Sequence, residues 1–452
     1  MSAQSSLRFW GKTRPQSAVY IHSYKPLLHH LLDVAATALR LQEVTPARLK
    51  RDAEAIGVRV DRLASTTAFL IGLHDLGKFS VSFQAKVPEL WPQDVLGVLP
   101  DKPNDRGHWR NTAIILRWRE AELEIQSLFP NLSLGLGLQM VSASVAGHHG
   151  RPPTADETNY NRYGFQTEQE VTGPCLTAAL EAMHFLRDLI RPEPWPEITD
   201  AEQMMALSWR LAGLTTLADW VGSDSDYFTF EDPGTELADY WRHALTQAEK
   251  AVTVKGLLPS PVRADVAFAD LVPDVAPRPM QVAAATVTLP HGPALFVLED
   301  TTGSGKTEAA LAIASRLMGA GRAEGIYFAL PTMATANAMH VRLGDIRRRL
   351  YSDRASPSLV LAHGRAALSR DLMKSTGQAR NGYDEDDDDS TSSCAEWIAD
   401  DRRKAFFADI GAGTIDQAFL AILKKKHLTL RQYGLAGRIL IVDEAHAFDA
   451  YM

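Results

Sequence analysis

The chain has 452 residues, of which 45% are hydrophobic, 23% charged and 8% aromatic, and its net charge is -8. This composition excludes disordered, fibrous and membrane proteins, and the length predicts two to four globular domains at about 100–200 residues each. The two cysteines are too few for a disulfide framework or a thiolate zinc site. We expect a cytoplasmic protein without membrane contact, in which local basic patches are still free to bind nucleic acid.

The first half of the chain has a helical pattern. Apolar residues recur every three or four positions from about residue 26 to residue 241, for example in LLHHLLDVAATALRL and MMALSWRLAGLTTLADWVG. This periodicity predicts an all-α domain over residues 1–250. Prolines then cluster between positions 259 and 279, where they break helices. We therefore expect a linker over residues 251–280 and a second domain over residues 281–452.

The second half alternates between strand-like and helix-like segments. ALFVLED, GIYFALP and GRILIVDEA have the apolar character of buried strands, and TEAALAIASRLM has that of a helix. Such alternation predicts an α/β domain with a parallel sheet. The acidic run DEDDDDS at 384–390 repels itself, so we expect a solvated, disordered loop there.

Histidines and aspartates with metal-binding potential occur on or beside the predicted helices. The candidate ligands are His30, His74, Asp75, His108, His148, His149 and Asp219. Adjacent residues on one helix diverge by about 100°, which would allow Asp75 to bridge two ions while His74 binds one. Imidazole and carboxylate ligands suit iron, manganese, nickel or cobalt better than magnesium. The set predicts a centre with two divalent transition metal ions.

Some of these residues also have a structural interpretation. His108 by itself would be a loop histidine, and Asp219 could cap or pair locally. His29 is expected to be structural or solvent-facing. His30 is favoured over it because Asp33, three residues later, would orient the His30 ring from the same helix face.

Two such metal ions would activate a water molecule and stabilise the leaving oxygen of a phosphate ester, so the centre predicts phosphate-ester hydrolysis. Asp75 and Lys78 are the candidate catalytic residues in this half. Lys78 and Ser223 follow candidate ligands in sequence, so both are predicted to contact a scissile phosphate; otherwise they are ordinary surface residues.

The segment VLEDTTGSGKTEAAL has the strand, glycine-rich turn and helix of a phosphate-binding loop. Backbone N–H groups would hold phosphates, Lys306 would reach the β and γ oxygens, and Thr307 would bind Mg²⁺. Asp300 stands where the first glycine of the motif is usual, which leaves ATP affinity open. The predicted nucleotide-binding residues here are Gly303, Ser304, Gly305, Lys306 and Thr307.

Two further segments fit an ATP site with Mg²⁺. ILIVDEAH ends a strand at Asp443 and Glu444, where Asp443 would hold Mg²⁺ and Glu444 would act catalytically by positioning the attacking water. Gln281 precedes the first strand, where its amide could read adenine. Without the upstream loop, these residues would be an acidic turn and a surface glutamine.

The combination of TGSGKT and DEAH resembles a superfamily 2 helicase motor. FALPTMATANAM (328–339) and AGTIDQAFLAILKKKHLTLR (412–431) resemble the nucleic-acid-facing motifs of its first RecA-like domain. The resemblance implies that four polar residues contact the nucleic-acid backbone, although each alone could be a loop or helix-cap residue. These are Thr332, Asn337, Thr414 and Gln417.

An HD-type nuclease placed before such a motor resembles the CRISPR-associated nuclease-helicases of type I interference systems. HDLGK, GHH, LADWVGSD and GTIDQA carry the resemblance, which covers nearly the whole chain. It implies cutting of single-stranded DNA opened by a surveillance complex with guide RNA, followed by ATP-driven 3′ to 5′ translocation. It also implies one ion held by His30, His74, Asp75 and Asp219, and a second held by Asp75, His108, His148 and His149.

The chain departs from this family pattern in two further respects. Lys25 stands where the family often has histidine, and the sequence ends six residues after DEAH. We therefore expect the second RecA-like domain to be absent, with the chain either a fragment or half of a split protein completed by a separate chain. Two other functions compete: a nucleotide-cleaving HD phosphohydrolase with a regulatory phosphate-binding loop, and a non-catalytic recruitment module.

Overall fold

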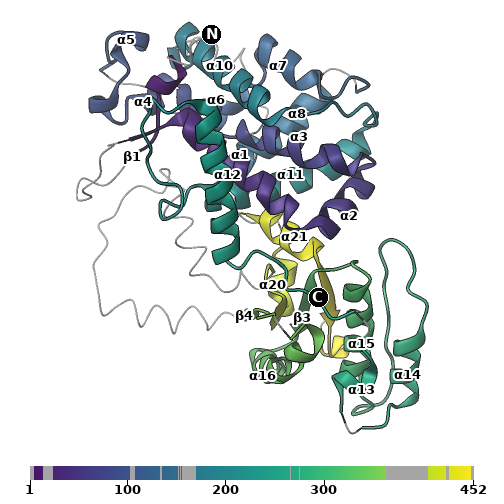
Figure 1. The fold of residues 1–452 in the computed structure, drawn as a ribbon. Helices are drawn as coiled ribbons and strands as arrows, with labels where there is room; N and C mark the ends of the chain where they lie inside the picture. Colours follow the sequence, from purple (N-terminus) through teal and green to yellow (C-terminus); the bar gives the residue numbers. More distant parts are fainter. Residues whose placement is uncertain are drawn as a thin grey trace, which may run out of the picture. The chain divides into compact units, whose positions relative to one another are not determined.

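The computed structural model describes residues 5–13, 24–101, 107–132, 135–150, 152, 154, 169–264, 266–273, 275–353, 355–362, 406–423 and 427–448. The predicted acidic loop at 384–390 lies outside the described residues. The chain forms two compact units (Figure 1). Of the described residues, the helical unit comprises those up to 255 and residues 427–430, and the α/β unit comprises those from 256 to 362, 406–423 and 431–448.

The helical unit is built mainly from α-helices and short 3-10 helices (Figure 1). Its elements are η1 (Ser6–Arg8), β1 (Trp10–Thr13), β2 (Tyr24–Pro26), α1 (Leu27–Glu43), α2 (Pro46–Ile56), α3 (Val60–Gly72), η2 (Leu76–Phe79), α4 (Val81–Gln84), η3 (Pro88–Leu90), α5 (Gln93–Leu96), α6 (His108–Ile115), α7 (Arg119–Gln126), α8 (Leu136–Ala146), η4 (Gly147–His149), α10 (Gly173–Ile190), α11 (Ala201–Gly222) and α12 (Leu237–Val254).

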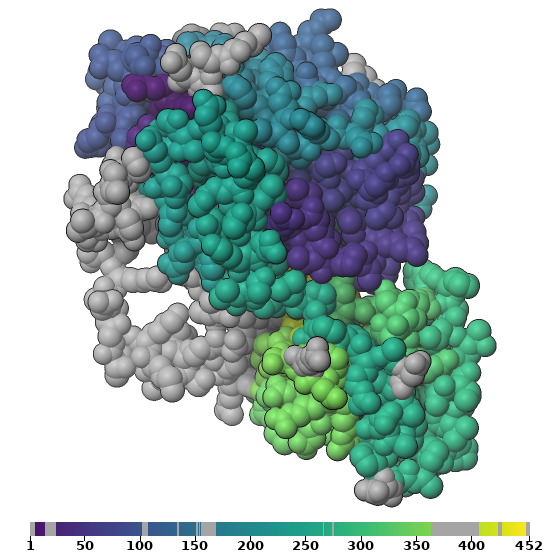
Figure 2. Space-filling model, viewed as in Figure 1, coloured from purple at the N-terminus to yellow at the C-terminus, as the bar shows by residue number. Residues whose placement is uncertain are grey.

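Helix α1 is the centre of this unit. It packs against α3, α11 and α12, and every residue from Leu27 to Ala38 is buried. A helix that is buried on all sides must be apolar or hold its polar groups in internal contacts, and the sequence LLHHLLDVAATA meets this condition. Helix α12 is instead amphipathic, with its apolar residues buried and its polar residues mostly exposed. It forms part of the teal surface in Figure 2.

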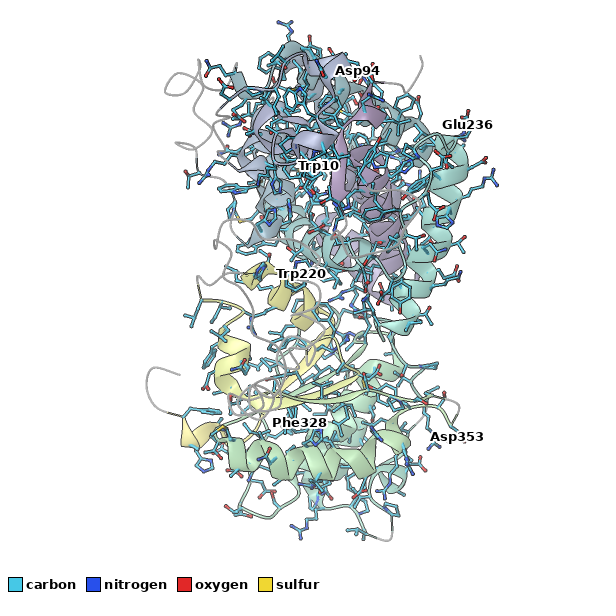
Figure 3. All side chains as sticks on the ribbon, turned by 90° about the vertical axis from the view of Figure 1, so that its left-hand side faces the viewer. Trp10, Asp94, Trp220, Glu236, Phe328 and Asp353 are labelled. Carbon is cyan, nitrogen blue, oxygen red and sulfur yellow. The ribbon has the colours of Figure 1, made fainter. Side chains whose placement is uncertain are left out.

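A two-stranded antiparallel sheet adds to the helical domain that the periodicity predicts. Strand β1 pairs with β2, with an irregularity in register between Trp10 and Lys12. Trp10, which is labelled in Figure 3, is 5% exposed. Its ring packs at a tilt on Phe83, with ring centroids 4.5 Å apart. The sheet therefore fixes the N-terminal segment against the short helices that follow α3.

The α/β unit contains a four-stranded sheet with the order β4-β5-β3-β6. Its elements are α13 (Phe268–Leu271), α14 (Pro279–Thr286), α15 (Lys306–Gly319), β3 (Gly325–Leu330), α16 (Met333–Leu350), β4 (Leu359–Ala362), β5 (Ile410–Thr414), α20 (Ile415–Phe419), β6 (Arg438–Val442) and η5 (Ala445–Ala447). Helix α21 (Leu428–Ala436) begins in the segment assigned to the helical unit. All paired strands of this sheet are parallel, which confirms the predicted fold class.

Both faces of β3 are buried, which explains its continuous apolar sequence GIYFAL. Ile326 and Phe328 pack in one core with α15 and α16, whereas Tyr327 and Ala329 pack in a second core that includes Phe406. This alternation follows from the two-residue period of a strand, and Phe328 is labelled in Figure 3.

Two strand predictions in this unit are wrong in part. Residues 294–300 (ALFVLED) are not assigned to a strand, and Leu295 and Val297 are 89% and 79% exposed. Among the described residues no strand pairs with this run, although the side chains of Phe296 and Leu298 pack against the core. Strand β6 is formed as predicted, but it is the edge of the described sheet, and Leu440 and Val442 are exposed instead of buried.

The predicted linker at 251–280 contains ordered structure. Its first four residues form the last turn of α12. The helix can extend to Val254 because no proline interrupts it before Pro259. Val262 then makes an isolated bridge to Tyr351 within the α/β unit. No helix in the described part of the chain has both the length and the apolar character needed to cross a bilayer.

Candidate functional site

The HDLGK segment lies directly after the end of α3. The periodicity predicts His74 and Asp75 on the helix, but α3 ends at Gly72 and the two residues form the turn before η2. Both are buried, with at most 1% of their surface exposed. The turn directs the Asp75 carboxylate into the interior of the helical bundle.

Gly77 allows helix α6 to pass very close to this turn. A Cβ atom at this position would lie 1.8 Å from the carbonyl oxygen of His108 and 2.4 Å from the nitrogen of Thr112. Gly77 N–H donates to the Thr112 hydroxyl (2.8 Å), and that hydroxyl donates to the carbonyl oxygen of His74 (3.0 Å). The glycine therefore lets the start of α6 bring His108 next to Asp75.

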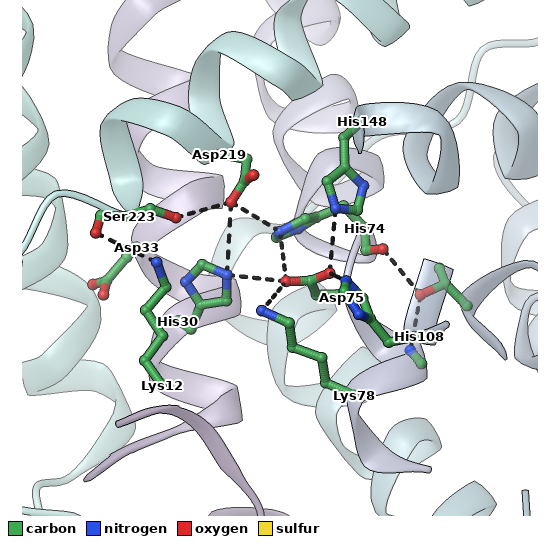
Figure 4. A network of polar contacts seen from close by, with 12 residues as sticks. Lys12, His30, Asp33, His74, Asp75, Lys78, His108, His148, Asp219 and Ser223 are labelled. Atoms are coloured by element: carbon green, nitrogen blue, oxygen red, sulfur yellow. Dashed lines mark hydrogen bonds and ion pairs between the residues drawn. The ribbon is translucent and has the colours of Figure 1, made fainter. Parts of the chain in front are cut away.

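The remaining candidate ligands come from three other parts of the helical unit. His30 is on α1, Asp219 is on α11, and His148 and His149 end η4. The structure brings all seven predicted ligands together in two groups that share Asp75. Figure 4 labels all of them except His149. The groups are His30, His74, Asp75 and Asp219, and Asp75, His108, His148 and His149; within each, the ligand atoms lie within 4.8 Å of one another.

The two oxygens of Asp75 face different groups. Oδ2 lies 3.1 Å from Nε2 of His30 and 3.2 Å from Nε2 of His74. Oδ1 lies 3.3 Å from Nε2 of His108 and 3.4 Å from Nε2 of His148. A carboxylate that divides its oxygens in this way is suited to bridge two cations.

Backbone carbonyls fix the tautomer of two of the histidines. Nδ1 of His74 donates to the carbonyl oxygen of Ile71 (3.0 Å), and Nδ1 of His148 donates to that of Val145 (2.8 Å). In a neutral imidazole the other nitrogen then carries a lone pair. Nε2 of both rings therefore faces Asp75 as a ligand atom, in the arrangement typical of metal-binding histidines.

Charges within the site shift the pKa values of its groups. Burial alone would raise the pKa values of Asp75 and Asp219, but the neighbouring His74 holds both well below the usual range, with Lys78 contributing at Asp75. Burial would also lower the pKa of His74, yet the two carboxylates raise it to about 9. Both carboxylates are therefore ionised at neutral pH, and His74 must release a proton when it binds a cation.

The two polar residues predicted beside the ligands contact the ligand carboxylates directly. Nζ of Lys78 lies 2.8 Å from Oδ2 of Asp75, and the hydroxyl of Ser223 donates to Oδ1 of Asp219 (2.9 Å). Both residues are buried. The surface interpretation of Lys78 and Ser223 is therefore wrong.

Asp33 does not orient His30, contrary to the prediction from their spacing. Its carboxylate pairs with Lys25 and accepts a hydrogen bond from the hydroxyl of Tyr240 on α12 (3.0 Å). His29 is buried and stacks on the Tyr240 ring with centroids 3.6 Å apart, so it is structural and not solvent-facing. Burial and the nearby Lys25 lower the pKa of His29 to about 3.

Sequence reasoning missed three polar residues around the site. Thr112 holds the HDLGK turn as described above. Lys12 on β1 donates to the carbonyl oxygen of Ser223 (3.4 Å), and Gln84 at the end of α4 donates to the carbonyl oxygen of Lys78 (2.8 Å). Lys12 lies near the ligands because β1 pairs with β2. No spacing pattern in the sequence could show this, since the first ligand is eighteen positions later.

The glycine-rich segment forms a turn before α15, which begins at Lys306. Gly303 and Gly305 have φ values of 77° and 90°, in the left-handed region that glycine adopts without strain. Ser304 between them is buried. Lys306 donates to the carbonyl oxygens of Asp300 (2.9 Å) and Thr301 (3.1 Å), across the turn.

The end of β6 lies beside the start of α15. The hydroxyl of Thr307 and Oδ2 of Asp443 are 3.4 Å apart, so the two predicted Mg²⁺ ligands face each other. Glu444 adopts left-handed backbone angles (φ 54°, ψ 42°) and its carboxylate lies 3.3 Å from His446. A non-glycine residue in this region is uncommon, and such conformations cluster at functional sites.

Gln281 contacts the glycine-rich turn directly. Its Nε2 donates to the carbonyl oxygen of Gly305 (3.2 Å), and its Oε1 accepts from the N–H of Arg278 (2.9 Å). Its amide is thus used within the chain, and adenine recognition by Gln281 stays a prediction.

The four residues predicted to face nucleic acid lie near one edge of the sheet. Thr332 follows β3 and caps α16, and Thr414 is the last residue of β5, which pairs with β3. Asn337 and Gln417 lie on α16 and α20, the helices that follow these strands. The carboxyl edge of a parallel sheet is a common ligand-binding position, and the contacts of these residues with nucleic acid stay predictions.

Comparison with known proteins places this geometry in a family. Residues 10–228 match the family described as Cas3, HD domain. The chain is 30% identical over 478 aligned positions to the CRISPR-associated endonuclease/helicase Cas3 of Escherichia coli, and covers 98% of itself and 51% of that protein. Residues 10–228 therefore belong to the Cas3 HD-domain family. It is also 31% identical to the Cas3 endonuclease/helicase of Thermus thermophilus, covering 99% of itself and 47% of that protein.

Solved Cas3 structures resemble both units of the chain. T. fusca Cas3 with AMPPNP matches with a TM-score of 0.76 at 29% identity, over 98% of this chain and 47% of that one. A chain in a CRISPR RNA-guided surveillance complex, described as pre-nicking, matches with a TM-score of 0.63 at 25% identity, over 98% and 44%. The chain therefore spans about half the length of the Cas3 proteins that it matches.

Proposed function

We propose that the helical unit is a metal-dependent endonuclease that cuts single-stranded DNA. The observation that carries this proposal is the pair of ligand groups that share the buried Asp75. Five imidazoles and two carboxylates match the donor preference of transition metal ions such as iron, manganese, nickel or cobalt. Two such ions would polarise a phosphodiester and lower the pKa of a bound water molecule.

Asp75 and its neighbours would bind the metal ions and the substrate phosphate. Asp75, whose two carboxylate oxygens face different ligand groups, would hold both ions. Lys78 carries a buried ammonium group next to Asp75 and would neutralise a phosphate oxygen of the substrate. Ser223 holds Asp219 in position through its hydroxyl.

The α/β unit would bind ATP with Mg²⁺ as the first motor domain of a 3′ to 5′ DNA helicase. Support comes from the Thr307 and Asp443 pair, from the left-handed turn before Lys306, and from the AMPPNP complex of the similar T. fusca protein. Thr332, Asn337, Thr414 and Gln417 would contact the DNA backbone. A similar chain occurs in an RNA-guided surveillance complex, which supports a role of this chain in CRISPR defence with such a complex as partner.

Incubation of the protein with closed circular single-stranded DNA tests the nuclease proposal, with a mixture of dNTPs as the competing substrate. We expect cutting of the circle with Mn²⁺, Ni²⁺ or Co²⁺ and little cutting with Mg²⁺ alone after chelation, because imidazoles dominate the ligand set. A circle without ends makes the assay specific for endonucleases.

Three results would contradict the proposal in different ways. Release of phosphate or nucleoside from dNTPs, with the circle intact, would instead indicate a nucleotide phosphohydrolase. Inactivity towards both substrates with every metal would favour a recruitment module. Strong cutting with Mg²⁺ alone would mean that the ligands are wrongly assigned.

A further inference from the structure

A second lysine lies close to the metal ligands. Lys12 is on β1, far in sequence from Lys78, and it is half-buried. Its Nζ donates to the carbonyl oxygen of Ser223 (3.4 Å), the residue whose hydroxyl donates to Asp219. In the view of Figure 4, Lys12 and Lys78 approach His30 from two sides.

Both lysines lie beside the carboxylate ligands. Nζ of Lys78 is 2.8 Å from Oδ2 of Asp75, and Lys12 contacts Ser223, whose hydroxyl donates to Asp219. Lys78 shares the charge of Asp75 with His74, whereas the contact of Lys12 with Ser223 is to a neutral carbonyl oxygen. The positive charge of Lys12 can therefore serve an anionic substrate.

A buried glutamine connects the two segments that carry these lysines. Nε2 of Gln84 donates to the carbonyl oxygens of Trp10 (2.9 Å) and Lys78 (2.8 Å). Its Oε1 accepts from the Trp10 N–H (3.2 Å), and its own carbonyl oxygen accepts from the Trp10 indole (3.2 Å). Gln84 is 0% exposed, and both N–H groups and the oxygen of its side-chain amide form hydrogen bonds within this connection.

The ring of Phe83 completes the connection. It stacks on Trp10 with centroids 4.5 Å apart, and Nζ of Lys78 lies 5.4 Å from its centroid. The His108 ring packs on it edge-on at 5.4 Å. Strand β1 is thereby fixed to η2 and to the start of α6 by hydrogen bonds and by aromatic packing.

From this arrangement we propose that Lys12 binds a backbone phosphate of the single-stranded substrate, and that Gln84 is the positioning residue that sets Lys12 relative to Lys78. The inference rests on the proposed nuclease function. Two cations from different elements can contact different phosphate groups of one strand. The arrangement would increase the affinity for a polynucleotide, which has several backbone phosphates, but not for a mononucleotide.

Steady-state cleavage of a single-stranded oligonucleotide by the Mn²⁺-loaded protein tests Lys12. Lys12→Ala should raise KM about tenfold and change kcat less than about threefold, because one charged contact to substrate is lost. The slope of log(kcat/KM) against log[salt] should become shallower by about 0.7, the value for one phosphate contact to a single strand. Lys12→Arg keeps the charge and should restore most of the affinity.

Lys50→Ala is the matched control, since Lys50 is an exposed lysine of the same unit, on α2. The same KM and salt slope for Lys12→Ala and Lys50→Ala would overturn the proposal. Loss of activity without a change in salt slope would also overturn it, because a structural role does not alter counterion release. Failure of the unmodified protein to cut single-stranded DNA would instead contradict the proposed function.

A double-mutant cycle tests Gln84. Gln84→Met keeps the length of the side chain and removes its hydrogen bonds, so it should raise KM. In the Gln84→Met background, Lys12→Ala should raise KM by less than about a further twofold. Fully additive effects would show that Gln84 does not act through Lys12. If Gln84→Met is not folded at the assay temperature by circular dichroism, Gln84→Asn gives a second comparison, since it keeps the amide but is too short to bind both Trp10 and Lys78.

Discussion

Asp75→Ala is expected to reduce cleavage of single-stranded DNA by about 10³-fold or more. Its two oxygens face both ligand groups, with four histidine nitrogens between 3.1 and 3.4 Å away. Removal of this carboxylate therefore weakens both metal sites at once. It also leaves the buried ammonium group of Lys78 without its partner.

The measurement is the cleavage rate of circular single-stranded DNA at saturating Mn²⁺, together with far-UV circular dichroism to show that helical content is nearly unchanged. Asp188→Ala removes an exposed carboxylate on α10 and should leave the rate within about twofold of the unmodified protein. Full activity of Asp75→Ala would remove the two-metal proposal.

Lys306→Ala is expected to weaken ATP binding at least about tenfold, because the ammonium group would lose a charged contact to phosphate. In the structure Lys306 reaches back across the glycine-rich turn to two carbonyl oxygens, so ATP would replace these contacts. Cutting of single-stranded DNA should stay unchanged. Every proposed metal ligand belongs to the helical unit, between His30 and Asp219.

ATP affinity is measured by equilibrium binding of a fluorescent ATP analogue in the presence of Mg²⁺. Cutting is measured on the same preparation with circular single-stranded DNA. Lys250→Ala, at an exposed position of α12, should alter neither. If Lys306→Ala abolishes cutting while the protein stays folded, the two activities are coupled, and the assignment of nuclease chemistry to the helical unit alone is wrong.

The metal ligands could be predicted because their chemistry leaves a local pattern. His74 and Asp75 occur next to a glycine and a lysine, and His148 and His149 form a doublet that packing does not require. The ends of helices then deliver these residues to one place. The prediction placed His74 and Asp75 on the helix itself, whereas the structure has them in the following turn, because periodicity does not define where α3 ends.

Contacts between distant segments could not be read from spacing. Asp33 is three residues from His30, which favoured an interaction, but the tertiary fold brings Lys25 and Tyr240 to its carboxylate instead. A buried ion pair of this kind depends on which helices pack together, and α12 begins some two hundred residues later.

The same limit applies to the sheet. Residues 294–300 have the composition of a buried strand. Such a segment forms a strand only when other strands pair with it, and composition does not show whether they do. Among the described residues no strand pairs with this run, and Leu295 and Val297 are exposed. Strand β3 was predicted correctly because its partners β5 and β6 lie on both sides of it.

Diffraction at the manganese absorption edge, from crystals of the protein grown with Mn²⁺, tests the two-metal centre most directly. We predict two anomalous peaks about 3.5–4 Å apart, with Asp75 between them, one beside His30, His74 and Asp219 and the other beside His108, His148 and His149. A single peak, or well-occupied manganese sites elsewhere with none at Asp75, would contradict the account.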